Sequence, residues 1–376
     1  MNMYLPGQTT PFGDVVGSSA FNWTVPTLWQ QVKENVDFDA RLATVSAFNS
    51  QNRFRKRGIA MVPTKYGMTP SGYSVGCLIN VLDDTSIEVF HSGSEIGQGI
   101  NTKVAQAVAY GLGCDLGAIV VGDNSSAAVP NGGCTGGSGT SETCVGAALV
   151  ACEKIMAALK GDDGGDGGEE ESWETLAKPI SATGWFTEPA ATENGSFDYA
   201  TQGVCFAEVE VDVLTGEIQI RRADIHMDLG ASLNPAIDIG QIEGGFIMAL
   251  GYFLCEEVLF QHDKAKPMRH AENQIQINLG TWNYKVCSAY DIPEVLNVSL
   301  LDVPNPSPAA ILSSKACAEP PMALACAVVL AAKECIYDAR SKLHGLSNHI
   351  QLDIPLTTQR IQEACLADAP GTLHLS

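Results

Sequence analysis

The segment VCFAEVEVDVLTGEIQIRRADIHMD, which begins at Val204, constrains the fold more than any other part of this chain. Apolar residues such as Val209 and Val211 alternate in it with acidic residues such as Glu210, and Gly216 marks a turn before a second β-rich run. A period of two residues on either side of such a turn predicts a β-hairpin. The chain is therefore expected to form at least one sheet.

Further strands and several apolar helices surround this hairpin in the sequence. Strands are expected at 57–65, 74–84, 85–93 and 118–123. Helices are expected at 26–36 (weakly), at 100–112, at 142–159 and from about Pro235 and Pro320 onwards. No other helix is expected in the first 50 residues. This mixture predicts an α+β fold in which helices pack on small mixed sheets.

An acidic, glycine-rich segment interrupts this pattern. The stretch GDDGGDGGEEES starts at Gly161 and has the composition of a flexible connector. We therefore expect two mixed α/β lobes, residues 1–160 and 177–376, joined by a linker at 161–176. The basic cluster at 53–57 is expected to be a solvated turn before a strand.

Composition argues against several classes of partner. A net charge of −21 repels a nucleic-acid backbone, and the apolar run Gly244–Cys255 is too short to span a bilayer. The N-terminal residues show no signal peptide. The twelve cysteines form no C-x-x-C pair, and the seven histidines have no ligand spacing. We expect a cytoplasmic protein with no nucleic-acid or membrane partner and no metal held by its own side chains.

Two glycine-rich loops at helix starts are candidate ligand sites. In the first, Ser94–Gly99, Gly97 permits a close backbone approach, free N–H groups favour an anion, and Gln98 offers both a donor and an acceptor. The second, Asn131–Ser141, consists almost entirely of small and hydroxylated residues that suit a phosphate or a polar heterocycle. The alternative for the first loop is a purely structural turn, and the alternative for the second loop is a flexible connector.

A serine hydrolase built on Ser138 of the second loop is a further hypothesis. The loop lacks the lysine of a P-loop, and Thr140 breaks the G-x-S-x-G pattern of a nucleophile elbow. A third candidate is Glu319, which immediately precedes an apolar helix. It is either a partly desolvated general base or an acid that only complements the helix dipole.

Five segments resemble, in this order, segments of xanthine dehydrogenases and aldehyde oxidases, the molybdenum hydroxylase family. They are KRGIAMVPTKYGM, GSEIGQGINTK, GVCFAEVEVDVLTGE, MDLGASLNPAIDIGQIEGGF and SKACAEPP. The resemblance covers nearly the whole chain outside the acidic segment and implies the C-terminal part of the molybdopterin-binding region. The sequences of these segments are slightly closer to those of xanthine dehydrogenases than to those of aldehyde oxidases.

The resemblance implies roles for particular residues. Glu319 matches the family's catalytic base, Gln98 the glutamine beside the molybdenum cofactor, and Gln241 a further pterin contact. The other implied cofactor-binding residues are Gly97 and, in the loop that wraps the pterin, Thr135, Gly137, Ser138, Gly139 and Thr140. The implied cofactor is molybdenum-molybdopterin. The implied reaction is hydroxylation of a purine (xanthine or hypoxanthine) or of an aldehyde.

Departures from the family pattern limit what is expected of the chain alone. Ala318 stands where the family has glycine, and the substrate-pocket phenylalanine has no match near Thr69. The family's iron–sulfur domains, FAD domain and first molybdenum lobe would all precede Met1. We therefore expect the isolated chain to be inactive and to need upstream domains or a partner chain, in what is usually a homodimer. The alternative is a non-catalytic remnant or binding subunit that pairs with a partner chain.

Overall fold

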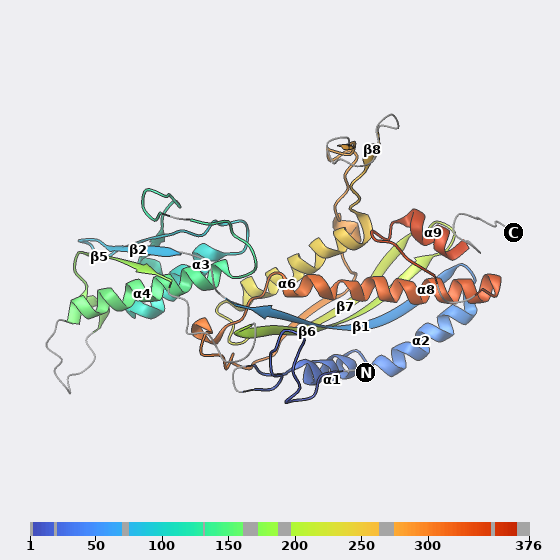
Figure 1. Cartoon of the computed structure of the whole chain (residues 1–376), viewed down its shortest axis with the longest axis horizontal. Helices are drawn as coiled ribbons and strands as arrows, with labels where there is room; N and C mark the ends of the chain where they lie inside the picture. The colour runs from blue at the N-terminus through green and yellow to red at the C-terminus, as the bar shows by residue number, and fades with distance from the viewer. Residues whose placement is uncertain are drawn as a thin grey trace.

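The computed structural model describes residues 3–18, 21–69, 75–130, 132–160, 172–186, 197–262, 274–346 and 350–366. They form two lobes, which lie at opposite ends of the long axis in Figure 1. Each lobe contains a four-stranded sheet with helices packed on it. The expected α+β class with small mixed sheets is confirmed. No helix within the described ranges is long and apolar enough to cross a membrane.

The larger lobe is built on a long, nearly antiparallel sheet. Its strands, in order across the sheet, are β1 (Arg55–Met68), β6 (Tyr199–Asp212), β7 (Ile218–Asp228) and β10 (Leu296–Leu300). Only β7 and β10 run parallel. The helix α8 (Cys326–His344) covers one face, while α1 (Val25–Asn35) and α2 (Phe38–Gln51) cover the other (Figure 1). The predicted hairpin is thus confirmed as β6 and β7.

Both faces of β6 are buried, including the face that carries its acidic residues. Glu208 accepts a hydrogen bond from Arg41 of α2, and Glu210 accepts one from Arg57 of β1, both at 2.8 Å. Lys56 has a side chain only 1% exposed and pairs with an aspartate of α8 at 3.0 Å. The expectation that residues 53–57 form a solvated turn is therefore wrong for Lys56 and Arg57. Their charges are compensated inside the lobe, which alternation alone could not show.

The smaller lobe is a mixed sheet with two helices against it. The strand order is β4 (Ile119–Val121), β3 (Ile87–His91), β2 (Gly76–Val81) and β5 (Ile180–Trp185). The helices are α3 (Ile100–Leu112) and α4 (Thr140–Lys160). Gly113 ends α3 in the left-handed conformation, as its position after the last apolar residue predicts.

The two sheets do not divide the chain at the acidic segment. β1 lies within the expected first lobe, 1–160, yet it pairs along its whole length with β6 of the second half. Conversely, β5 from the second half pairs with β2 of the first. The boundaries 1–160 and 177–376 therefore have to be corrected, because each half contributes a strand to the other's sheet. Most of the expected linker, 161–171, lies outside the described residues.

The remaining elements connect the lobes and extend the larger one. The helix α6 (Pro235–Leu250) starts at the predicted Pro235, is capped by Asn234 and ends in a π-helical turn, Gly251–Cys255. The helix expected from Pro320 is divided into α7 (Pro320–Leu324) and α8. Short elements are α5 (Trp173–Leu176), α9 (Thr358–Leu366), β8 (Phe260–His262), β9 (Gln274–Gln276) and the 3-10 turns η1 (Leu116–Ala118), η4 (Ala289–Asp291) and η5 (Ile311–Ser313). The helix α2 was not predicted, and it follows α1 directly.

Gly58 allows α8 to pack closely on β1. A Cβ atom at this position would lie 2.0 Å from the carbonyl oxygen of Ala331. We expect Gly58→Ala to lower the free energy of unfolding by roughly 1–3 kcal/mol, because such overpacking forces backbone shifts. Urea unfolding followed by circular dichroism measures the change.

Gly240→Ala on α6 is the control for this prediction. No heavy atom lies within 4 Å of the added methyl group, and alanine should stabilise the helix by about 0.5–1 kcal/mol. Equal unfolding free energies for the two variants would contradict the close approach of α8 to β1.

Candidate functional site

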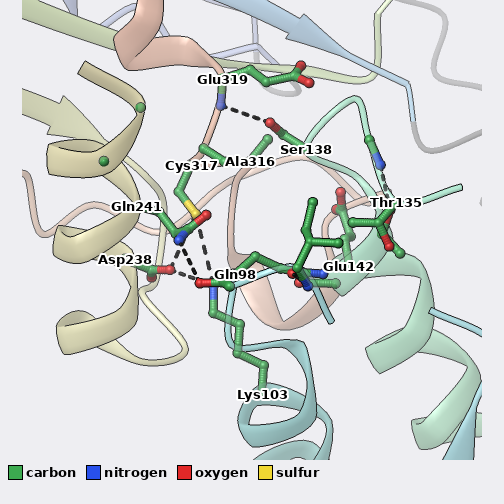
Figure 2. Close-up of a pocket in the computed structure, with 18 of the residues that line it drawn as sticks. Gln98, Lys103, Thr135, Ser138, Glu142, Asp238, Gln241, Ala316, Cys317 and Glu319 are labelled. Atoms are coloured by element: carbon green, nitrogen blue, oxygen red, sulfur yellow. Dashed lines mark hydrogen bonds and ion pairs between the residues drawn. The ribbon is translucent and has the colours of Figure 1, made fainter. Parts of the chain in front are cut away.

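A cavity of about 520 Å³ lies where the two lobes meet. Loops that precede α3 and α4 line it from the smaller lobe, and α6 together with the segment 314–322 lines it from the larger lobe (Figure 2). Seven of the sequence-predicted residues line this cavity: Gly97, Gln98, Thr135, Ser138, Thr140, Gln241 and Glu319. Gly137 and Gly139 belong to the same loop as Ser138. Residues as far apart in sequence as Gly97 and Glu319 are thus brought to one pocket.

The start of α3 differs from the sequence expectation of free N–H groups. The carboxylate of Glu95 accepts hydrogen bonds from the backbone N–H groups of Gly97 and Gly99, at 3.0 and 2.9 Å, and of Asn101 at 3.3 Å. Burial alone would raise the pKa of Glu95, but these backbone hydrogen bonds outweigh it and lower the pKa. The Glu95 carboxylate is therefore the anion bound at this helix start, in place of an anionic ligand.

The side chains of the two predicted glutamines meet at the first loop. Gln98 folds back on its own loop, where its Oε1 accepts from Ile96 and its Nε2 donates to Ser94. Gln241 reaches across from α6 and donates to the carbonyl oxygen of Gly97 at 3.3 Å. Figure 2 shows Gln241, from α6, close to the loop that carries Gln98. The Gln241 amide therefore connects the lobes at the edge of the cavity.

The glycine-rich loop before α4 holds Glu319 in place. The Ser138 hydroxyl accepts a hydrogen bond from the backbone N–H of Glu319 at 2.9 Å, and the Gly137 N–H donates to its carboxylate at 3.0 Å. The other carboxylate oxygen accepts a hydrogen bond from Tyr66 of β1. Thr135 ties the same loop to the first one through hydrogen bonds with Ser94. The carboxylate is thus held by hydrogen bonds from both lobes.

Both loops present bare backbone to open space. A Cβ atom added at Gly97, Gly136 or Gly137 would meet no heavy atom within 4 Å. Gly97 and Gly137 adopt positive φ, and so does Ser138 at 58°, which keeps the loop tightly curved. Such a concave stretch of backbone can accommodate a polar, flat or phosphorylated ligand at close range. The lining residues include no histidine, so the histidine base of a Ser–His pair at Ser138 is lacking among them.

A buried charged cluster forms one wall of the cavity, and the sequence analysis did not find it. Lys103 pairs with Asp238 at 2.6 Å, and Asp238 also accepts from Ser232. The Cys317 sulfur lies 3.5 Å from the same carboxylate, and burial raises the pKa of this thiol to about 12. The three groups come from α3, α6 and the segment before α7. Their proximity depends on tertiary packing and leaves no signature in local sequence.

Glu142 is a second titratable group that the sequence analysis missed. It lies in the first turn of α4, lines the cavity and accepts a hydrogen bond from the Tyr199 hydroxyl at 2.8 Å. Burial raises its pKa to about 7, although the hydrogen bond from Tyr199 opposes this shift. The site therefore contains a carboxyl group that titrates near neutral pH.

Comparison with known proteins shows which protein family the chain resembles. A family model described as a molybdopterin cofactor-binding domain matches residues 31–293. Xanthine dehydrogenase 1 of Arabidopsis thaliana is 37% identical over 97% of this chain, and xanthine dehydrogenase/oxidase of Gallus gallus is 36% identical over the same share. The matched region is 27% of each relative, so the chain spans about a quarter of their length.

Solved structures share the fold at lower sequence identity. The aldehyde oxidoreductase from Desulfovibrio gigas has a TM-score of 0.72 and 23% identity, and covers 97% of this chain with 38% of its own. The CO dehydrogenase from Oligotropha carboxidovorans has a TM-score of 0.71 and 19% identity over 90% of this chain and 45% of its own. These likenesses establish that the arrangement of both lobes is shared.

Replacing Glu142 should change how stability depends on pH. The native state holds the Glu142 proton up to about pH 7, whereas an unfolded glutamate releases it near pH 4.5. The folded state therefore binds the extra proton in this window, and the stability contributed by the group is lost as the pH rises through it. We expect the unfolding free energy of Glu142→Gln, relative to wild type, to increase from pH 4.5 to 7.5 by at most roughly 3 kcal/mol, at about 1.4 kcal/mol per pKa unit.

Urea unfolding at a series of pH values measures this difference. Glu153→Gln, at an exposed position of the same helix, corrects for the loss of one negative charge from α4. A difference between Glu142→Gln and wild type that does not change with pH, after this correction, would show that Glu142 ionises normally.

Proposed function

This chain belongs to the molybdopterin cofactor-binding domain family of xanthine dehydrogenases and related molybdenum hydroxylases, and from that premise we propose that its interlobe cavity binds the molybdenum cofactor. The single observation that carries the proposal is the convergence of both glycine loops, Gln241 and Glu319 on that one cavity. A chance set of family-like segments would have no reason to share one pocket.

The residues present fit such a group. Open space beside Gly97, Gly136 and Gly137 leaves room for a ligand against bare backbone, and Thr135 and Ser138 add hydroxyl groups. We infer that Gln98 and Gln241 turn their amide groups from the first loop to the pterin, exchanging the hydrogen bonds that they make to Ser94 and Gly97. When bound, the cofactor supplies the two-electron redox centre.

Glu319 is the proposed general base of the reaction. Hydrogen bonds from Gly137 and Tyr66 hold its carboxylate in a defined position, and the backbone bond to Ser138 fixes the start of the side chain. A carboxylate placed in this way can accept a proton from a group that reacts in the cavity. The protein thus contributes a positioned base and a shaped, partly closed pocket around it.

The substrate and partners follow from the family relationship as proposals. We propose hydroxylation of a purine or an aldehyde, with electrons leaving through iron–sulfur and FAD groups on other domains or on a partner chain. The chain spans about a quarter of the curated relatives, and this supports a need for such additional parts. A cytoplasmic location is proposed because all twelve cysteines of the chain are free thiols in the structure. A homodimer is proposed from the family relationship alone.

Loss of both glutamines should weaken cofactor binding. The double variant Gln98→Ala, Gln241→Ala removes two amide groups that face the cavity, and we expect roughly tenfold or greater loss of retained cofactor. Molybdenum per chain, by mass spectrometry, and released pterin, by fluorescence, measure retention after expression in a host that makes the cofactor. Gln359→Ala on exposed α9 is the control. Equal retention in the three proteins, each assembled with the remaining domains, would refute the proposed site.

Substitution of the base should separate binding from turnover. In the enzyme assembled with its remaining domains, Glu319→Gln should retain cofactor but lose hydroxylation by about 10²–10⁴-fold, which is the range contributed by general-base catalysis. Turnover of xanthine and of an aldehyde with an artificial electron acceptor measures the loss and identifies the substrate class. Unchanged turnover would remove Glu319 from the mechanism. An assembled wild type that binds cofactor but hydroxylates neither would favour the non-catalytic binding subunit.

A further inference from the structure

A second cluster of metal-ligating groups lies outside the cofactor cavity. Cys255 ends the π-helical turn after α6, while Cys287 lies just before η4 and Asp291 is the last residue of η4. The two sulfurs are 3.8 Å apart, and the carboxylate oxygen of Asp291 joins them in a group whose atoms all lie within 4.8 Å of one another. We propose that Cys255, Cys287 and Asp291 bind a zinc-like divalent cation. This site would join the end of α6 to the segment that leads into β10.

The spacing of the sulfurs suits a tetrahedral cation. Zinc–sulfur bonds of about 2.3 Å at a tetrahedral angle place two thiolate sulfurs about 3.8 Å apart. Cys255 and Cys287 already have this separation, whereas a disulfide requires about 2.05 Å between the sulfurs. The two ligands would therefore need little movement to bind. Three protein ligands leave the fourth tetrahedral position for water.

Charge distinguishes a metal site from a simple contact between two thiols. The charged side chains that act on both cysteines are Asp291 and Glu256, and both are carboxylates that disfavour thiolates. No cationic side chain is among the groups that act on either thiol within the part of the chain that the structure describes. A divalent cation would compensate this local excess of negative charge. It would also make thiolates of both cysteines, as metal binding requires.

The surrounding hydrogen bonds orient the ligands in advance. Asp291 Oδ2 accepts from the Ser288 backbone N–H at 2.6 Å and from the Ser288 hydroxyl at 2.8 Å, in a capping box. Both bonds use Oδ2, and no hydrogen bond to Oδ1 is found in the part of the chain that the structure describes. Glu256, next to Cys255, accepts from Tyr284 at 2.6 Å. Such supporting partners typically orient metal ligands.

The location indicates a structural role. The hairpin of β8 and β9 projects from the end of α6 in Figure 1, and the Cys255–Cys287 contact lies where the chain leaves and rejoins the larger lobe. A cation there would fix the C-terminal end of the helix that carries Gln241. Cation binding to the native state should therefore raise the unfolding temperature, and the increase should grow with the free cation concentration. The proposal is independent of cofactor binding.

Cobalt titration of the full chain tests the site. The protein is made in a host without molybdenum-cofactor synthesis, reduced, stripped with EDTA and titrated with Co²⁺ in the absence of oxygen. We expect one Co²⁺ per chain, with thiolate-to-cobalt charge-transfer absorption that one equivalent of Zn²⁺ abolishes. Zn²⁺ alone should raise the unfolding temperature. Wild-type protein without this absorption, or with a Cys255–Cys287 disulfide that persists under reducing conditions, would overturn the proposal.

Variants assign the ligands. Cys255→Ser and Cys287→Ser should each weaken Co²⁺ binding by more than roughly 100-fold, since even changes to supporting residues cost about 10–100-fold. Asp291→Asn should weaken it less and leave the charge-transfer absorption in place. Cys134→Ser, which removes an exposed thiol of the smaller lobe, is the matched control and should bind as wild type does. Absorption that persists in both ligand variants but disappears in Cys134→Ser would refute the assignment.

Discussion

A completely buried ion pair between Lys315 and Asp228 connects the segment before Glu319 to the central sheet. Its atoms are 2.8 Å apart, and both side chains are 0% exposed. Asp228, at the end of β7, also accepts hydrogen bonds from Asn22 and Thr24 of the N-terminal segment. Burial lowers the pKa of Lys315, yet the attraction of Asp228 and its hydrogen bond offset part of this shift. Removing one partner of such a pair typically costs roughly 3–5 kcal/mol, so the position of the segment before Glu319 depends on an ion pair that is buried from solvent.

Local patterns predicted several of the helices and strands but not how these elements assemble. The start of α6 at Pro235 and the end of α3 at Gly113 depend on neighbouring residues alone, and both agree with the sequence expectation. The pairing of β1 with β6 joins residues about 150 positions apart, so no local period could predict it. The missed helix α2 buries only Val45 and Asn49, and so lacks an apolar stripe of helical period.

The same difference between local patterns and tertiary contacts explains which residues of the candidate site could be predicted from the sequence. Gln98, Ser138 and Glu319 were found because each lies in a short segment with an unusual composition that also resembles a family. Lys103 and Asp238 also lie in family-like segments, but nothing in either segment indicates that their side chains pair, since they are 135 residues apart. The contact between Cys255 and Cys287, 32 residues apart, has no local signal either. Residues that act through tertiary contacts therefore become visible only in the folded chain. The buried pairs around a site are less predictable than the groups that face its ligand.

The departure at Ala318 illustrates how packing determines the effect of a substitution. A Cβ atom at Gly245 of α6 would lie 2.4 Å from the Ala318 carbonyl oxygen, so helix and backbone are already in close contact there. The next residue, Glu319, is bonded through its own N–H to Ser138. With its backbone fixed on both sides, the methyl group of Ala318 has little freedom to shift the carboxylate. Because Ala318 lines the cavity, its methyl group instead reduces the space for a ligand beside Glu319. The substitution should therefore affect which molecules fit more than where the base lies.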